Sequence, residues 1–254
     1  MRKILEVCTD TFTSVKNACI SSSDRVELCS DLQTGGITPS YAFVEKVVNS
    51  FDIPVNILIR PRVGNFCYSE DEFEIMCEDI KKLKLLNING IVSGVLKKNG
   101  CVDYEKTKKL VEISKPLEFT FSRAIDNSAD YEKGIKDIID CGATRILTSG
   151  GYSGINMGIE NLIKILYKFG NNIIIMPGGG LDMNNLKKLL SSGFCEFHSS
   201  ASGFIEDECY NNSDLSGMGH YIHNNKRGYM YANTDKIKEM KNIIENYSGS
   251  GNLL

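Results

Sequence analysis

Two stretches, Leu5-Glu6-Val7-Cys8 and Val26-Glu27-Leu28-Cys29, decide the fold because each has the composition of a short buried β-strand. Positions i and i+2 of a strand share one face, so the glutamate and the cysteine of each stretch project together. The interval between the stretches leaves room for one short helix joining two parallel strands. Buried carboxylates are costly as packing alone. The pattern therefore indicates a site as well as a fold.

The rest of the chain repeats the alternation of short apolar runs and amphipathic windows. It predicts strands at 4–8, 25–29, 55–61, 90–96, 117–123, 145–150, 173–177 and 194–199. It predicts helices at 11–21, 40–50, 70–87, 103–114, 129–141, 158–169, 183–191 and 235–246. Such alternation favours parallel βαβ units, and eight of them favour a single TIM-like (β/α)8 barrel of the α/β class. An open doubly wound sheet is the alternative, but the first turn, 9–11, lacks its glycines.

One barrel domain is expected over residues 1–254. Residues 202–234 are rich in Ser, Asn, Gly and Tyr without a clear period, which predicts a long irregular loop before the C-terminal helix. That loop is interpreted as a lid, an oligomer contact or a partly mobile insertion. Residues 248–254 are expected to form a flexible tail.

Composition narrows the class of partner. The chain has 254 residues, 42% hydrophobic and 24% charged, with a net charge of −3 and no polybasic stretch, which argues against nucleic acid. No apolar run reaches the roughly 18 residues of a membrane span. The nine cysteines are scattered without CxxC spacing, which is typical of reduced thiols in a cytoplasmic protein.

In a β/α barrel the functional site lies at the carboxyl ends of the strands. Arg60 and Arg62 end the third predicted strand and share its face, so we expect both to point inward and to pair with Glu6 and Glu27. Arg123 ends the fifth strand. Three arginines beside carboxylates are explained either by a structural ion-pair network or by a site for an anionic ligand.

Further strand ends supply candidates for an oxyanion site. Gly179 and Gly180 follow the seventh strand, where backbone N–H groups of many barrels hold phosphate, and a tight turn is the alternative. Ser149 and Ser199 end the sixth and eighth strands. His198 beside Ser199 is either a satisfied core residue or an acid/base and anion donor.

Cys8 and Cys29 raise the question of a metal. Thiolates on adjacent strands suit a soft ion such as Cu(I). The neighbouring carboxylates oppose thiolate formation and would weaken that site. The alternative is that both cysteines are small core residues.

Ordered blocks along the chain carry a family resemblance: Leu5–Cys8, Asp24–Cys29, Gly35–Ser40, Ile59–Arg62, Phe66–Ser69, Thr120–Ala124, Leu147–Gly150, Met176–Gly180 and Glu196–His198. With these blocks the chain resembles the CutC family of copper homeostasis proteins, closely over residues 3–201. The resemblance implies a TIM-like barrel, a cytoplasmic location, a homo-oligomer and a role in copper handling with Cys8 and Cys29 as Cu(I) ligands. Two positions differ: Ser122 stands where the family usually has histidine, and Ser202 where it usually has arginine.

Two functional hypotheses follow, beside a third in which the chain is a scaffold with a vestigial pocket, a reading that only Ser122 favours. The first is a CutC-like copper homeostasis protein that binds Cu(I) weakly through Cys8 and Cys29. The second is a barrel enzyme acting on a small anionic, possibly phosphorylated, metabolite. In the enzyme, Glu6, Glu27 and His198 would move the proton. The anion-binding groups would be Arg60, Arg62, Arg123, Ser149, Gly179, Gly180 and Ser199.

Overall fold

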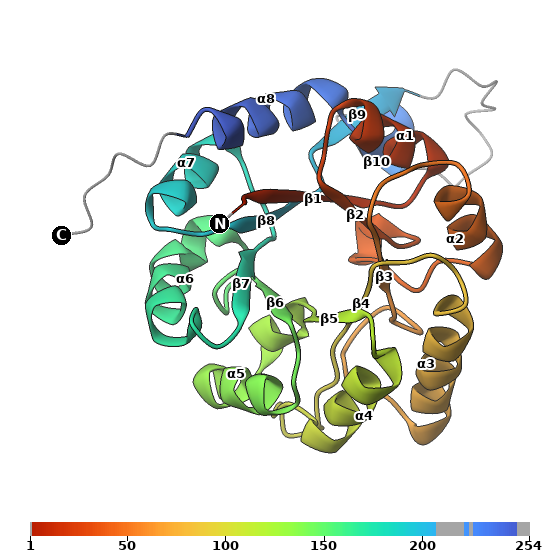
Figure 1. Ribbon diagram of the computed structural model, residues 1–254, viewed down its shortest axis with the longest axis vertical. Helices are drawn as coiled ribbons and strands as arrows, with labels where there is room; N and C mark the ends of the chain where they lie inside the picture. The colour runs from red at the N-terminus through yellow and green to blue at the C-terminus, as the bar shows by residue number, and fades with distance from the viewer. Residues whose placement is uncertain (1, 207–220, 224–225, 248–254) are drawn as a thin grey trace.

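Eight parallel strands form a ring at the centre of the molecule, and eight helices surround the ring in the described residues (Figure 1). The structure is a computed structural model, and it describes residues 2–206, 221–223 and 226–247. The predicted (β/α)8 barrel is confirmed. No helix in these ranges is long and apolar enough to cross a membrane.

The strands are hydrogen-bonded in the order β7-β6-β5-β4-β3-β2-β1-β8, and β8 lies beside β7, which brings the ring to near closure. Their bounds are β1 Ile4–Thr9, β2 Arg25–Leu28, β3 Val55–Leu58, β4 Gly90–Ser93, β5 Glu118–Phe121, β6 Arg145–Thr148, β7 Ile174–Pro177 and β8 Glu196–Ser199. The helices are α1 Phe12–Ile20, α2 Tyr41–Val48, α3 Glu70–Leu83, α4 Tyr104–Ser114, α5 Tyr131–Asp140, α6 Ile155–Phe169, α7 Met183–Ser191 and α8 Thr234–Glu245. Two short 3-10 helices, η1 Leu32–Thr34 and η2 Arg123–Asn127, follow β2 and β5.

The two faces of each strand have different partners. Val26 and Leu28 of β2 face the helices and are fully buried in the main hydrophobic core. Between them, Glu27 faces the barrel interior. Helix starts follow ordinary capping chemistry: the Ser69 hydroxyl accepts from the Glu72 N–H, and the Glu72 side chain accepts from the Ser69 N–H. Local signals therefore set the elements, and strand alternation sets which side chains enter the barrel.

The segment predicted to be irregular, 202–234, is ordered at both of its ends, and this corrects the prediction. Strands β9 (Ser202–Glu206) and β11 (Lys226–Ala232) pair antiparallel, and β10 (Tyr221–His223) pairs with β11. A Cβ at Gly228 would lie 1.9 Å from the Ile205 carbonyl oxygen, so this close pairing requires glycine. Because β9 and β11 contain glycine and β9 begins with serine, they lack the clear alternation of apolar and polar residues that predicts a strand. Residues 207–220 and the predicted tail at 248–254 lie outside the described ranges.

Candidate functional site

A cavity of about 380 Å³ lies at the carboxyl ends of the barrel strands, where the fold predicts a site. Its size suits a small molecule. Seven of the predicted site residues line it: Cys8, Glu27, Arg60, Arg123, Gly179, Gly180 and His198. The remaining walls are largely apolar and include Leu58, Phe66, Val92 and Leu147, with Met230 of β11 on one side.

Strand register places the polar groups of the floor. Glu6 on β1 is in register with Arg25 on β2 and with His198 on β8. Neighbours in register on parallel strands point to the same side of the sheet. These three side chains therefore form one layer inside the barrel. Cys8 is in register with Glu27, which places both one layer nearer the cavity mouth.

Glu6 is fully buried and fully partnered. Its Oε2 accepts from Arg25 Nε at 2.5 Å and from Asn56 Nδ2 at 2.9 Å, and its Oε1 lies 2.8 Å from His198 Nδ1. Burial alone would raise the pKa of Glu6, but Arg25 and His198 outweigh burial and hold it well below its usual range. Glu6 is therefore a carboxylate that orients the imidazole.

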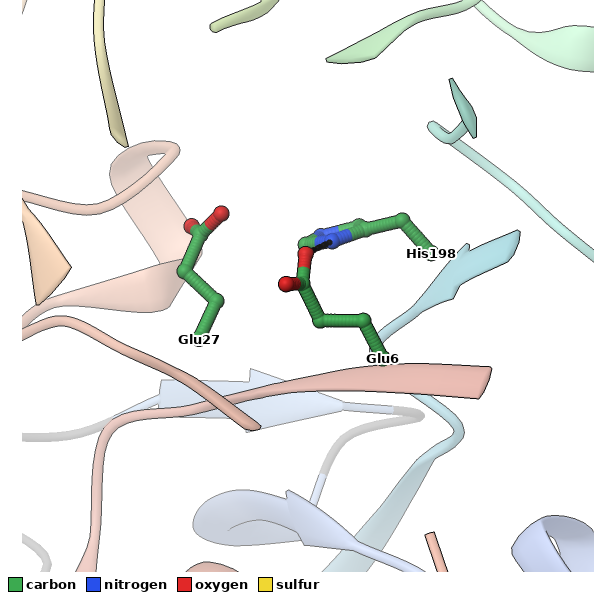
Figure 2. Close-up of side chains that lie close together, drawn as sticks. All are labelled: Glu6, Glu27 and His198. Carbon is green, nitrogen blue, oxygen red and sulfur yellow. Dashed lines mark hydrogen bonds and ion pairs between the residues drawn. The ribbon is translucent and has the colours of Figure 1, made fainter. Parts of the chain in front are cut away.

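Glu27 faces Glu6 and His198 from the opposite side of the floor (Figure 2). Burial, with the negative charge of Glu6, raises its pKa from 4.5 to about 7. Its Oε2 is buried and has no hydrogen-bond partner in the described residues. For His198, burial lowers the pKa, but Cys8, Glu6 and Glu27 outweigh burial and hold it well above 6.5. The floor thus combines a carboxyl group that titrates near neutrality with an imidazolium.

The two candidate thiols differ in access. Cys8 lines the cavity, with 6% of its surface exposed. Cys29 is fully buried and lies off the cavity, packed with Leu58 and Val92, and its Sγ lies 3.6 Å from the Thr9 carbonyl oxygen to which it donates. Burial, reinforced by nearby negative groups, raises the pKa of Cys29 strongly. Only Cys8 is therefore directly accessible from the cavity.

Arg60 and Arg62 do not pair with Glu6 and Glu27, so that prediction is wrong. Arg60 donates to the carbonyls of Thr34, Gly36 and Gly64, and its guanidinium lies over the ring of Phe66. No ion pair within the described ranges includes Arg60, and its Nε has no hydrogen-bond partner there. Its charge therefore lies in the cavity wall without a counter-ion.

Arg62 lies off the cavity lining, because its guanidinium binds Glu72, with Nε–Oε1 at 2.5 Å, and the Cys67 carbonyl. A parity argument places both arginines inward only while the strand continues. The strand β3 ends at Leu58, before either residue. The chain bends over residues 61–64, so the parity that brings Arg60 to the cavity no longer holds at Arg62.

The glycines after β7 line the cavity and have N–H groups without a partner. The N–H groups of Gly179 and Gly180 make no hydrogen bond within the described part of the chain. Both residues have positive φ, +94° and +86°, and a Cβ at Gly179 would lie 2.7 Å from the Arg123 guanidinium carbon. Glycine is thus required at 179 for both backbone and packing reasons.

Three other candidate anion groups are occupied by the protein itself. Arg123 lines the cavity, but its guanidinium binds Asp126 and the Ser149 hydroxyl. Ser149 is fully buried, and its N–H donates to Asp126. The Ser199 hydroxyl accepts from the Ala201 N–H, and neither serine lines the cavity. Asp126 therefore fills the position that a ligand anion would take beside Ser149.

The sequence pattern did not predict the network of ion pairs that lies below the cavity floor. Arg25 joins Glu6 to Glu196 at 2.5 and 2.7 Å, and Arg145 joins Glu196 to Glu118 at 2.6 and 3.1 Å. A signal was available, because Arg25 shares strand parity with Glu27 and is in register with Glu6 once the strands are paired. The arginines of this network supply the positive charges that the buried carboxylates need, so Glu6 stays ionised without Arg60.

Fold and cavity together define a β/α-barrel protein with a cavity at the carboxyl ends of its strands. Comparison with known proteins gives the family. The chain matches the CutC family over residues 3–203 and belongs to it. It is 38% identical over 242 residues to a family protein CutC from Klebsiella pneumoniae (strain 342), covering 95% of this chain and 97% of the relative. It is 35% identical over 244 residues to the human copper homeostasis protein cutC homolog, covering 96% and 89%.

Solved structures agree with this assignment. A crystal structure from Streptococcus agalactiae, assigned to the CutC copper homeostasis proteins, has a TM-score of 0.73 and 32% identity, covering 78% of this chain and 98% of that one. KGPDC from Streptococcus mutans, at a TM-score of 0.59 and 14% identity, covers 98% of this chain and 100% of its own and shares the fold alone. The family relation and the barrel are thus established independently.

Proposed function

We propose that this chain is an enzyme-type member of its copper homeostasis family, and that its cavity takes a small anionic molecule, such as a phosphorylated metabolite. The observation that carries the proposal is the set of unpartnered polar groups around one cavity. These groups are the Arg60 charge, the N–H groups of Gly179 and Gly180, and the Glu27 carboxyl. Of these groups, Glu27 Oε2 and Arg60 Nε are buried, whereas Gly179 is half-buried and Gly180 is exposed. Buried polar groups without partners are costly, so a cavity that gathers two of them beside free N–H groups is suited to a ligand.

In the proposed complex the anionic end of the ligand binds the cavity walls and its reacting end lies at the cavity floor. Arg60 and the two glycines offer donors on the walls, which match the oxygens of a phosphate or carboxylate. Glu27 and His198 lie on the floor. A carboxyl group with a pKa of about 7 can both accept and return a proton near neutral pH. The proposed reaction therefore belongs to the acid–base class, with Glu6 positioning His198.

The test compares two substitutions of Arg60 in binding of inorganic phosphate, measured by isothermal titration. Arg60→Lys and Arg60→Gln both remove the guanidinium contacts to the carbonyls, but only Arg60→Gln removes the charge. Loss of a charge-assisted hydrogen bond corresponds to roughly tenfold or more in affinity. We expect Arg60→Gln to bind phosphate at least about tenfold more weakly than Arg60→Lys. Equal affinities in the two variants would reject the anion site.

A second candidate function is Cu(I) binding at Cys8 and Cys29, supported by the copper homeostasis names of relatives and by the position of Cys8 on the cavity. Cu(I) prefers thiolate ligands. The Cys29 thiol would have to leave the Thr9 carbonyl and lose its proton in a fully buried position. The proposed binding is therefore weak and depends first on Cys8. Competition with a Cu(I) chelator tests it in wild type and in Cys8→Ser.

Location and assembly remain proposals. The eight cysteines of the described residues are all free thiols, which supports a cytoplasmic location. A homo-oligomer is proposed from the family resemblance, and light scattering of the purified chain would test it.

A further inference from the structure

Two carboxylates and one imidazole meet at the bottom of the cavity, which Glu27 and His198 line and behind which Glu6 is fully buried. One ligand atom from each of Glu6, Glu27 and His198 lies within 4.8 Å of the other two (Figure 2). Three ligands held at about 2.0–2.2 Å from one ion lie within roughly 4.4 Å of one another. The three side chains therefore need to move by only a few tenths of an ångström to surround a single ion.

A second observation points to a missing ligand at the same place. Glu27 is 5% exposed, and its Oε2 has no hydrogen-bond partner among the described residues. Figure 2 shows the Glu27 side chain across from the Glu6 carboxylate and the His198 ring. A buried oxygen without a partner carries an uncompensated desolvation cost. A cation between the three residues would supply the partner.

The surroundings provide the outer support that metal sites need. Asn56 Nδ2 and Arg25 Nε both bind Oε2 of Glu6, at 2.9 and 2.5 Å, which fixes the carboxylate and directs Oε1 toward His198. Such outer hydrogen bonds hold first ligands in place. Glu27 and His198 also line the cavity, so coordination positions on that side would stay open to a bound molecule.

We propose that Glu6, Glu27 and His198 form a three-ligand site for a divalent transition-metal cation with open coordination toward the cavity, and that the bound cation displaces to solvent the proton between His198 and Glu6 and any proton on Glu27, since only a neutral imidazole and ionised carboxylates bind a metal. Carboxylate oxygens with one imidazole suit Mn²⁺, Fe²⁺ or Zn²⁺, and the absence of sulfur from this ligand set distinguishes it from a Cu(I) site. The inference goes beyond the proposed function, which assigns no ion to these residues.

The test uses Mn²⁺, because it favours oxygen and nitrogen ligands over thiolates. Loss of the free Mn²⁺ electron paramagnetic resonance signal reports binding to the full chain. We expect one Mn²⁺ per chain in wild type, and binding at least about tenfold weaker in Glu27→Gln and in His198→Gln. Glu239→Gln, which removes a carboxylate from the exposed face of α8, is the matched control and should bind as wild type. The double variant Cys8→Ser, Cys29→Ser should also keep Mn²⁺.

Three results would overturn the site: no binding by wild type at millimolar Mn²⁺, unchanged affinity in Glu27→Gln, or loss of Mn²⁺ in the cysteine variant. Circular dichroism checks folding, and His198→Gln serves as the readout should Glu27→Gln not fold. Phosphate titration of the same samples separates the two ideas. Phosphate binding without Mn²⁺ binding rejects this inference alone, and Mn²⁺ binding without phosphate binding rejects the anion site alone.

Discussion

Glu27→Gln should make the folded protein markedly more stable at pH 8 and only slightly more stable at pH 5. Glu27 is buried, and its pKa rises from 4.5 to about 7 on folding. Each tenfold change in proton affinity corresponds to about 1.4 kcal/mol, so the rise corresponds to about 3 kcal/mol. Glutamine has a similar shape and does not ionise, so the variant avoids this cost.

The sign follows from proton uptake. Between pH 4.5 and 7 the folded state keeps the Glu27 proton that the unfolded state has lost. The free energy of unfolding therefore falls as pH rises through this window and levels off above pH 7. In Glu27→Gln that decline is missing. The gain over wild type should grow from about 0.8 kcal/mol at pH 5 to about 3 kcal/mol at pH 8.

Urea unfolding followed by circular dichroism at pH 5 and pH 8 measures the difference. Glu239→Gln, at an exposed position of α8, controls for the loss of one carboxylate. A gain that is the same at both pH values would refute the claim that Glu27 is held protonated by burial. A loss of stability at pH 8 would refute it more strongly, because Glu27 would then be stabilising as a carboxylate.

Three further predictions concern neighbouring residues. Glu6→Gln should lower the free energy of unfolding, measured by urea denaturation, by about 3–5 kcal/mol, because it leaves the buried Arg25 charge without one of its two carboxylate partners. A loss below about 1 kcal/mol would contradict that role of Glu6. In competition with a Cu(I) chelator, Cys8→Ser should lower Cu(I) affinity more than Cys29→Ser, since only Cys8 is reached from the cavity, and the reverse order would reject Cys8 as the leading ligand. Gly179→Ala should lower the melting temperature more than Gly180→Ala, because both have positive φ but only the Cβ at 179 meets Arg123; equal shifts would show that packing adds nothing at 179.

Much of the fold was accessible from local sequence. Alternating apolar runs placed all eight barrel strands, and amphipathic windows placed the helices between them. Strands β9 and β11 were missed because residues such as Gly203 and Gly228 serve a close antiparallel pairing and carry no strand signature. Strand propensity depends on the side chains of a segment, whereas the pairing of β9 with β11 depends on how closely the two backbones approach each other.

The site was accessible only in part. Parity correctly brought Glu27 and Cys8 to the cavity, because both lie on regular strands. It failed at Arg62, which lies beyond the end of β3 and off the cavity, whereas Arg60 does line the cavity but pairs with neither glutamate. The partnership of Glu6 with Arg25 and His198 depends on register across three strands distant in sequence. Register arises from closure of the whole barrel, so no short motif contains it.

A crystal structure of the protein grown with inorganic phosphate tests the central claim, that the strand-end cavity takes an anionic molecule, most directly. We expect a phosphate in the cavity, with its oxygens within hydrogen-bond distance of Arg60 and of the N–H groups of Gly179 and Gly180. A cavity without phosphate in crystals that hold phosphate elsewhere on the chain would rule out the anion site.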